Sequence, residues 1–440
     1  MAARTGLQSL AFLAAVTVAN PAAAAREPAG LHQSLNQLSR EGKFSGAVVI
    51  RGDEGVRFTR GYGFADPFSG RRYTPDTPAD SGSVPKPMTA AAVLMLARDR
   101  TIDLDAPVRR YLIEYPHAAT TVRHLLAHSA GLAMKETPET VSSKSNSALI
   151  VEAGKGSPQP SFPPGSAFEY CNLCTIALAT LIERVTGRHY LEVIRDRLGV
   201  PDDVTLRPQR LADWNGRAIG YRRGRDGKLE RFDSWEGEAF YGAANLSISA
   251  SQLARWGAEW RKSPLASLRA DATAPAMIAG KRSGLTIGNW YCAKGGRRCH
   301  YGGHHEGFHH VYYWDVDRRI SLALMTNNTL EVALQQRLVR SLAAFAEGRA
   351  ADARRELASP LPDVPVASGA YLLPTGESVA VTRAEQRVGA VEHGGISYPA
   401  YRIGKGVRYV PGLDVFLSGA PDGGMHWLSL YEDFTARPSK

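Results

Sequence analysis

The chain has 440 residues, of which 44% are hydrophobic and 22% are charged. These proportions exclude a fibrous, coiled-coil or mostly disordered protein, and the length suggests two or three domains. The formal charge of +10 favours an anionic partner, but because no run of five or more like charges is present, we expect no nucleic-acid partner.

The N-terminus, residues 1–25, has the pattern of a secretory signal peptide. Arg4 precedes a short apolar stretch at 10–19, and small residues suited to a signal peptidase follow at 22–25. A short membrane anchor is the alternative, but the apolar stretch is shorter than the roughly 20 residues that span a bilayer. We therefore expect an exported protein, periplasmic or secreted, without a membrane span.

Residues 26–350 contain both helical and strand-like patterns. The middle of this region is helical, whereas strand-like residues occur near both of its ends, which predicts an α+β domain with a mixed sheet and an inserted helical lobe. Helices are expected at 31–40, 88–99, 173–185 and 331–347, and strands at 46–50, 56–64, 311–314 and 320–324.

A proline-containing linker at 351–365 precedes a region of different character. Residues 366–440 contain short β-type runs, at 378–382, 407–410 and 414–417, and these runs are separated by Gly-rich turns. The pattern predicts a small C-terminal antiparallel β domain.

Four cysteines are present, and an even number in an exported protein favours disulfide bonds. Cys292 and Cys299 flank a turn-like segment between two strand-like runs, which suggests a bond across a hairpin. Cys171 and Cys174 form a C-x-x-C pair, for which a redox motif or a zinc site is the alternative. The thioredoxin-like βαβ context that a redox motif needs is missing from the surrounding sequence.

Ser83-Val84-Pro85-Lys86 stands directly before the first expected buried helix. Residues three apart at a helix start lie on one face, so the Lys86 amine can assist deprotonation of the Ser83 hydroxyl. The unsatisfied N–H groups of the first turn can stabilise an oxyanion. Taken alone, the motif is weak, because a capped helix with a surface lysine has the same sequence.

Tyr170 and Asn172 stand at the start of the second expected buried helix. A tyrosine there can carry a proton to or from a reacting group, and the asparagine amide can hold a substrate. The structural alternative is a buried tyrosine beside a helix-capping asparagine.

Together these motifs resemble those of the serine β-lactamase and penicillin-binding-protein superfamily, closest to its class C, esterase and D-amino-acid peptidase branch. The resemblance covers residues 30–350 in family order. It implies a β-lactamase/transpeptidase-like fold. The segments that carry it are Gly82–Lys86 with Thr89–Ala91, Asp103–Val108, His128–Leu132, Pro164–Asn172 and Asn245–Trp256.

By this resemblance, Ser83 is the acylated nucleophile, Lys86 and Tyr170 share the general base and acid roles, and Asn172 binds the substrate amide or orients Lys86. The third family motif, a cation-x-Gly sequence on a strand edge, is assigned as follows: His300 is the cation, Gly302 is the motif glycine, and Gly303 supplies the second oxyanion N–H.

The third motif departs from the family spacing. The Gly307-Phe308 pair comes one residue later after His300 than the family pattern expects, which leaves the register open, with His304 as a substitute for His300.

A competing motif overlaps this region, because His305-Glu306-x-x-His309 is a literal H-E-x-x-H zinc-protease sequence. That motif binds zinc only on a helix, where both histidines face one metal. Gly303 and Gly307 disfavour a helix, and strand-like residues follow, so a turn between two strands is the simpler prediction. Incidental metal binding by the five clustered histidines remains an alternative to metal catalysis. We expect no metal and no cofactor.

The sequence thus favours an exported serine hydrolase that acts through an acyl-enzyme on an amide, ester or β-lactam carbonyl. A D-alanyl peptidase, a D-amino-acid peptidase or an esterase suits a histidine in the third motif better than a β-lactamase does, because histidine is less reliably charged than lysine. The substrate would be a small molecule or a peptide, cell-wall peptide included. The alternative is a non-catalytic penicillin-binding or peptidoglycan-sensing protein of the same fold.

Overall fold

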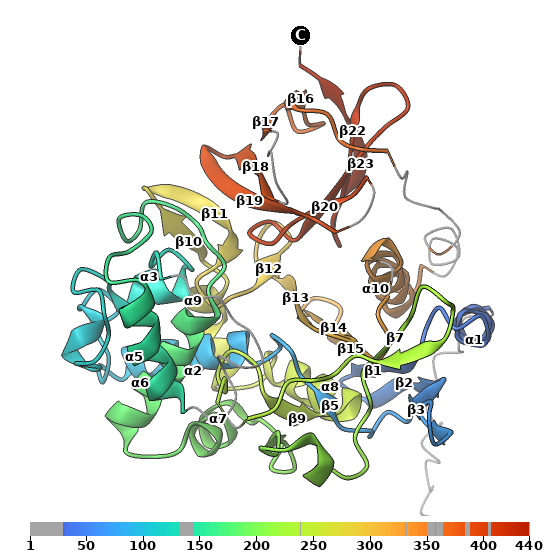
Figure 1. The fold of residues 1–440 in the computed structure, drawn as a ribbon, viewed down its shortest axis with the longest axis horizontal. Helices are drawn as coiled ribbons and strands as arrows, with labels where there is room; N and C mark the ends of the chain where they lie inside the picture. The colour runs from blue at the N-terminus through green and yellow to red at the C-terminus, as the bar shows by residue number, and fades with distance from the viewer. Residues whose placement is uncertain are drawn as a thin grey trace, which may run out of the picture.

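An eight-stranded sheet forms the centre of the first domain, in the order β10-β11-β12-β13-β14-β15-β1-β2 (Figure 1). All of its pairings are antiparallel, as the family resemblance implies, so the mixed sheet expected from the order of helical and strand-like segments is wrong. β1 and β15 are buried at almost every position, as expected for strands that are covered on both faces. The strands are β1 (Gly46–Gly52), β2 (Gly55–Tyr62), β10 (Pro275–Ile278), β11 (Lys281–Thr286), β12 (Tyr291–Cys292), β13 (Arg298–His305), β14 (Phe308–Asp315) and β15 (Ile320–Thr326).

The computed structural model describes residues 30–132, 145–237, 239–330, 332–349, 357, 364–382, 388–403 and 406–439. The expected signal peptide at 1–25 and most of the expected linker at 351–365 lie outside the described residues. Within the described ranges, no helix has both the length and the apolar character needed to cross a bilayer.

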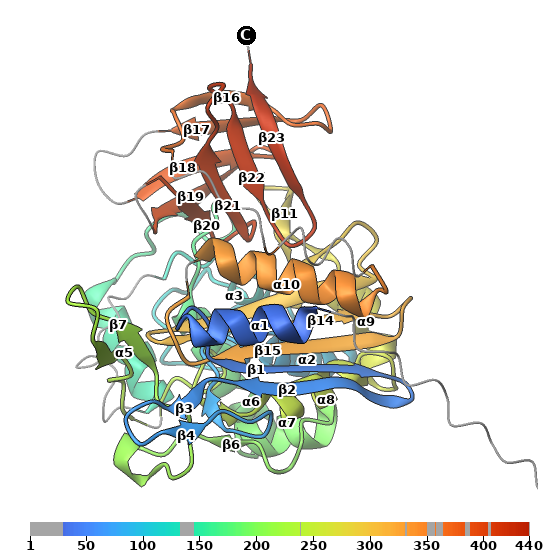
Figure 2. The ribbon, with the colours of Figure 1, turned by 90° about the vertical axis from the view of Figure 1, so that its right-hand side faces the viewer.

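Two layers of helix cover the sheet. α1 (Leu31–Arg40) and α10 (Val332–Ala346) lie on one face, where Figure 2 shows them stacked in front of β1 and β15. Leu31 and Leu35 of α1 are buried in the same hydrophobic cluster as the leucines of α10. α8 (Ala250–Glu259) packs on the opposite face against β1, β14 and β15.

A helical lobe inserted between β2 and β10 contains the elements that carry the first two sequence motifs. Its two central helices, α2 and α6, are buried over most of their length because their sequences are rich in alanine and leucine. The expected helices at 88–99 and 173–185 are thereby confirmed within two residues. The helices of the lobe are α2 (Lys86–Arg98), α3 (Val122–Leu126), α5 (Asn146–Gly156), α6 (Asn172–Thr186), α7 (Tyr190–Leu198) and α9 (Leu265–Ala272).

Short strands connect the lobe to the main sheet. A three-stranded sheet in the order β5-β9-β6 and the hairpins β3-β4 and β7-β8 lie around the end of the main sheet that carries the β13–β14 turn. Their bounds are β3 (Phe64–Asp66), β4 (Arg71–Arg72), β5 (Ala79–Asp80), β6 (Thr205–Leu206), β7 (Tyr221–Arg223), β8 (Leu229–Arg231) and β9 (Leu246–Ile248).

The C-terminal domain is a closed antiparallel barrel, which confirms the expected small β domain. Pairing of Tyr371 in the first strand with Pro438 in the last strand closes it. Closure leaves no free strand edge. The strands are β16 (Gly369–Leu372), β17 (Ser378–Thr382), β18 (Val388–His393), β19 (Ile396–Arg402), β20 (Arg408–Val410), β21 (Val415–Gly419), β22 (Met425–Leu428) and β23 (Asp433–Pro438).

The barrel packs against β11–β13 and α10 of the first domain (Figure 1). Lys281 Nζ donates to Gly395 O at 2.8 Å, and the Tyr291 hydroxyl donates to Pro411 O. The β18–β19 and β20–β21 turns of the barrel therefore contact β11 and β12 of the main sheet.

Both expected cysteine pairs are disulfide bonds. Cys292 and Cys299 are directly opposite in β12 and β13, so the bond across the hairpin is confirmed. Cys171 and Cys174 are bonded to each other at the start of α6. All four sulfurs are thus used in these two bonds, and the zinc alternative for the C-x-x-C pair is not supported.

Candidate active site

Ser83 lies in the turn that leads into α2, and Lys86 is the first residue of that helix. The Lys86 side chain is fully buried, with Nζ 3.0 Å from Ser83 Oγ and 2.9 Å from Ala243 O, to which it donates. Pro85 is tolerated because an N–H at this position has no partner within a helix. The turn therefore holds the lysine amine directly against the serine hydroxyl.

Tyr170 approaches the same hydroxyl from the segment before α6. Its phenolic oxygen lies 2.7 Å from Ser83 Oγ, and Lys86 Nζ lies 5.0 Å from the centre of its ring. The structure thus brings Ser83, Lys86 and Tyr170 together from two separate helix starts. Two groups that can exchange protons touch one hydroxyl oxygen, which is an arrangement that can activate a serine for acyl transfer.

His128 positions Tyr170, a contact that the sequence did not reveal. The two rings are stacked at 5.0 Å with 14° between their planes. His128 Nδ1 accepts the Cys171 N–H at 3.0 Å, so the proton is on Nε2, which donates to Asn289 Oδ1 at 2.7 Å. Burial, together with the positive charge of Lys86, lowers the pKa of His128 to about 4 and keeps the ring neutral.

His310 performs a similar task below the serine turn. Its Nδ1 accepts the Thr326 N–H at 3.2 Å, and its Nε2–H donates to Asp80 O at 2.7 Å. Burial lowers the pKa of His310 to about 4. A neutral histidine therefore anchors the backbone three residues before Ser83.

These two buried histidines predict a loss of stability in mild acid. Each has a folded-state pKa of about 4, below the unfolded value of about 6.5, so the unfolded chain binds more protons between these pH values. We expect the free energy of unfolding to fall on acidification from pH 6.5 to pH 4, by on the order of 3 kcal/mol for each histidine. Urea unfolding at several pH values measures this, and a flat profile over that window would contradict it.

Every second residue of β13 faces the turn that carries Ser83. A Cβ placed on Gly303 would lie 2.3 Å from Ser81 O and 3.0 Å from Ser83 N, so only glycine allows this approach. Because side chains alternate along a strand, Tyr301 and His305 share the face of Gly303. The opposite face carries His300 and His304.

The strand edge also fixes which N–H group is free to bind an oxyanion. His305 and Phe308 flank the two-residue turn and exchange hydrogen bonds, so the next pair, His304 and His309, directs its N–H groups outward. His309 N accordingly donates to Thr326 Oγ1, at 3.2 Å, on the far side. The outward N–H of His304, rather than that of Gly303, therefore faces the Ser83 turn.

His300 lies away from the serine, and this corrects the expected third motif. Its Nε2 lies 2.5 Å from Asp414 Oδ2, and its Nδ1 lies 3.1 Å from the Tyr431 hydroxyl, so it packs against the barrel. Gly302 shares that face. The substitute considered, His304, also turns its ring away, with Nε2 2.8 Å from Gln335 Oε1.

Tyr301 occupies the place that was assigned to His300. It is buried, stacks on Tyr291 at 5.7 Å, and neighbours Tyr170. Burial, followed by the contact with Tyr170, raises the pKa of Tyr301 well above its usual value and keeps the phenol protonated. The late Gly307-Phe308 pair was the signal in the sequence for this shift. If the motif begins at Tyr301 instead of His300, the spacing to this pair is the one that the family pattern expects.

A pair of substitutions separates these two assignments. Tyr301→Phe is expected to lower kcat about twofold to tenfold, because it removes one hydrogen-bonding group beside Tyr170. His300→Gln is expected to leave kcat within about twofold and to weaken barrel packing, because it removes the partner of Asp414. Steady-state kinetics with a p-nitrophenyl ester and thermal unfolding measure both effects. An equal loss of kcat in the two variants would favour a catalytic role for His300.

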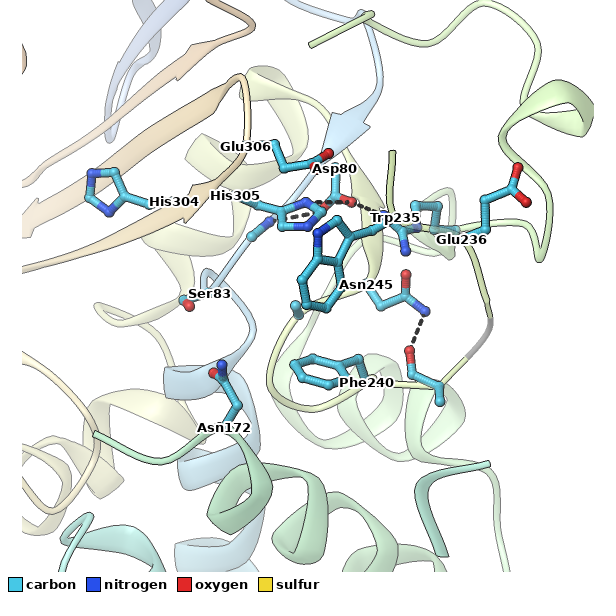
Figure 3. A pocket seen from close by; sticks show the side chains of 14 residues that line it. Asp80, Ser83, Asn172, Trp235, Glu236, Phe240, Asn245, His304, His305 and Glu306 are labelled. Atoms are coloured by element: carbon cyan, nitrogen blue, oxygen red, sulfur yellow. Dashed lines mark hydrogen bonds and ion pairs between the residues drawn. The ribbon is translucent and has the colours of Figure 1, made fainter. Parts of the chain in front are cut away.

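A cavity of about 290 Å³ opens beside Ser83. Figure 3 shows Trp235 and Phe240 across it from Ser83 and Asn172, so the two motif residues Ser83 and Asn172 line the same side of the cavity. The acidic side chains of Glu236 and Glu306 line the same cavity. Its wall is therefore aromatic on one side and polar at its rim.

The cavity floor contains a buried ion pair. Arg207 and Asp80 are in contact, with side chains that are 7% and 3% exposed. Asp80 Oδ1 also accepts the Gly82 N–H at 2.9 Å. Burial alone would raise the pKa of Asp80, but Arg207 and then His305 outweigh it and hold that pKa well below its usual range.

The structure excludes the zinc-protease alternative for His305-Glu306-x-x-His309. The three residues form the end of β13, the turn and the start of β14 rather than a helix. His305 and His309 belong to neighbouring pairs of the ladder, so their side chains point to opposite faces. Among the described residues, no three histidine, cysteine, aspartate or glutamate side chains gather as metal ligands.

A serine–lysine–tyrosine cluster beside a strand edge, on a sheet with a helical lobe, is the arrangement expected of a β-lactamase-like fold. The family model described as Beta-lactamase matches residues 31–346, and the chain belongs to that family. The resemblance stated from the sequence motifs is thereby confirmed.

The chain is similar to proteins of several activities. Esterase EstB of Burkholderia gladioli is 32% identical over 215 residues, 43% of this chain and 55% of that protein. D-aminopeptidase of Brucella anthropi is 29% identical over 164 residues, 36% of this chain and 31% of that protein. The chain thus spans about half or less of the length of these curated relatives.

Solved structures share the fold over most of the chain. The octameric penicillin-binding protein homologue from Pyrococcus abyssi has a TM-score of 0.63 at 19% identity, and it covers 90% of this chain and 94% of that one. The crystal structure of SurE has a TM-score of 0.59 at 22% identity, with 91% and 94% covered. At these identities the likeness concerns the fold alone.

Proposed function

We propose that the protein is a serine hydrolase that forms an acyl-enzyme at Ser83. The observation that carries the proposal is the contact of Ser83 Oγ with both Lys86 Nζ, at 3.0 Å, and the Tyr170 hydroxyl, at 2.7 Å. A structural serine does not need two proton-exchanging partners in one buried cluster. Membership of the beta-lactamase family supports the same chemistry.

The proposed reaction has two balanced steps. Ser83 Oγ attacks the substrate carbonyl carbon while its proton passes to the Lys86–Tyr170 pair. The N–H groups of Ser83 and His304 hold the oxyanion, the bond to the leaving group breaks, and the pair returns the proton to that group. Water then attacks the ester carbonyl and gives a proton to the same pair; the bond to Ser83 Oγ breaks, the pair returns the proton to that oxygen, and the acid leaves.

The substrate is proposed to be an ester, or an amide or peptide of a D-amino acid. Esterase EstB and D-aminopeptidase, to which the chain is similar, are named for such substrates. The aromatic wall of Trp235 and Phe240 suits an apolar acyl side chain. Tyr301, a neutral phenol, replaces the cation that would meet the carboxylate of a β-lactam, which makes penicillins the less suitable substrates.

We also propose that the protein is exported. The two disulfide bonds support this, because disulfides persist in oxidising compartments. Mass spectrometry of the N-terminus of protein recovered from a periplasmic extract tests it. A chain that still begins at Met1 in the cytosolic fraction would contradict export.

Two measurements on the same sample test the proposed function. A fluorophosphonate probe is expected to form one adduct, located at Ser83 by peptide mass spectrometry. Turnover of p-nitrophenyl esters, D-amino-acid p-nitroanilides and nitrocefin then identifies the substrate class. Repeated turnover supports the hydrolase, a single acylation without turnover favours a sensor of the same fold, and the absence of any adduct at Ser83 overturns the proposal.

A further inference from the structure

A second cleft, of about 440 Å³, lies at the end of the main sheet farthest from Ser83. It is formed where the β1–β2 turn, the ends of α8 and α9, and the β14–β15 turn meet, on the right-hand side of Figure 2. β14 runs eight residues from the active-site turn to this one, about 25 Å at the usual rise of a strand. We call it the basic cleft; its lining is Arg51, Gly52, Asp53, Ala258, Arg261, Lys262, Arg269, Val316 and Arg319.

The lining of the basic cleft carries five cations and one acid. These cations come from separate parts of the chain, so the fold, rather than a local charge run, brings them together. The single acid, Asp53, is already engaged by two of them: Arg261 Nε donates to it at 3.0 Å, and Arg319 is in contact with it. Lys262 is in turn paired with Glu259 at 2.7 Å, just outside the lining, so the net charge with this acid counted is +3 (five positive minus two negative).

Arg261 shows that this charge is not fully satisfied within the protein. Its side chain is only 11% exposed, and its Nη1 is buried without a hydrogen-bond partner among the described residues. A buried guanidinium nitrogen without an acceptor costs free energy, so the pairing of Arg261 within the protein is incomplete. The Asp53 carboxylate holds the other side of the same guanidinium in place.

Other charged residues on the β14–β15 turn are paired with opposite charges within the protein. Asp317, which lies near Arg269, is paired with Arg297, and Arg318 is paired with Asp315. By contrast, no acidic partner for Arg51 occurs in the described part of the chain, and Arg269 donates only to Trp260 O. Arg51 and Arg269 are therefore available to a ligand.

We propose that the basic cleft binds a ligand that carries two or more phosphate groups. Planar guanidinium groups pair with phosphate through two parallel hydrogen bonds, and each phosphate offers three acceptor oxygens and up to two negative charges. A diphosphate or triphosphate group neutralises a net charge of about +3 within a cleft of ligand size. The site is separate from Ser83, so the ligand is an effector or an anchor rather than the substrate.

Calorimetric titration with inorganic tripolyphosphate tests the proposal on the full chain. We expect saturable binding that weakens as salt is raised. Arg51→Gln should lower the affinity about tenfold, and Arg51→Gln/Arg269→Gln about a hundredfold, because charge-assisted hydrogen bonds are lost. The matched control is Lys228→Gln, an exposed lysine on the β7–β8 hairpin, which should bind like the unmodified protein. Both cleft arginines are near the surface, and thermal unfolding verifies that the variants fold.

A second experiment determines whether the phosphate groups belong to a lipid headgroup or to a soluble ligand. Vesicles of cardiolipin, whose headgroup carries two phosphates, in phosphatidylcholine are compared with tripolyphosphate, using the same variants. Binding to either probe that is lost in the arginine variants and kept in Lys228→Gln supports the site, with vesicles indicating a lipid headgroup and tripolyphosphate a soluble ligand. Tighter binding of citrate than of tripolyphosphate, equal binding by all variants, or no binding to either probe overturns the proposal.

Discussion

Replacing Ser83 with alanine is expected to lower kcat/KM by at least about 10⁴-fold, because the oxygen proposed to attack the substrate is lost. The change removes one oxygen that touches Tyr170 at 2.7 Å and Lys86 at 3.0 Å. The oxyanion donors and the cavity stay in place, so substrate still binds and KM changes little. Hydrolysis measured with the best ester or anilide of the panel reports the loss.

The matched control for this substitution is Ser267→Ala, an exposed serine on α9 that lies outside the cavity. It should retain full activity, and both variants should unfold at the temperature of the unmodified protein. A Ser83→Ala variant that keeps its activity, combined with loss of that activity in EDTA, would contradict the acyl-enzyme and favour a metal-dependent reaction.

Ser83, Lys86 and Tyr170 could be proposed together from the sequence because the ordered set of motifs resembles a known family, although each motif alone is weak. A serine three residues before a lysine at a helix start shares one face with it in almost any fold. The tyrosine likewise precedes a helix that its own composition predicts. What the motifs could not supply is the distance between Ser83 and Tyr170, 87 residues apart, which the packing of α2 against α6 sets.

The third motif shows where such reasoning stops. One residue of register decides which side chains of a strand face the site, because the period of a strand is two. Assigning the cation to His300 placed it on the face that packs against the barrel, beside Asp414, 114 residues later. A local sequence pattern does not reveal a contact with a residue in another domain. It also does not reveal the stacking of His128 on Tyr170, which are distant in sequence.

The barrel illustrates the same limit at the level of the fold. Alternating short runs and Gly-rich turns predicted strands, and β17 occupies the expected residues 378–382. Closure depends on the pairing of Tyr371 with Pro438, a contact between the two ends of the domain. Such pairing is set by the twist and number of strands rather than by any one segment.

Removal of Arg207 is expected to have the largest effect on stability. Arg207→Ala leaves Asp80 charged and buried without its main partner, and we expect a loss of about 3–5 kcal/mol in the free energy of unfolding at pH 7. Because Asp80 also accepts the Gly82 N–H, the turn that carries Ser83 should loosen, and kcat should fall together with stability. Urea unfolding and steady-state kinetics measure the two losses.

The pH dependence of the stability lost in Arg207→Ala shows whether the unpaired charge of Asp80 causes that loss. In the unmodified protein the pKa of Asp80 is held well below its usual value, so its contribution to stability is present above about pH 4 and is lost as the pH falls toward the folded-state pKa. Without Arg207, burial raises that pKa, and protonation relieves the unpaired charge. The stability gap between Arg207→Ala and the unmodified protein should therefore narrow as the pH is lowered from 7 to 4.

A double substitution distinguishes an unpaired buried charge from a simple packing defect as the cause of the lost stability. Arg207→Leu/Asp80→Leu removes both charges and should be more stable than Arg207→Ala, because no buried charge is left without a partner. Its stability relative to the unmodified protein should also change less between pH 7 and pH 4. A double variant as unstable as Arg207→Ala at every pH would show that shape, rather than charge, is what the pair contributes beneath the Ser83 turn.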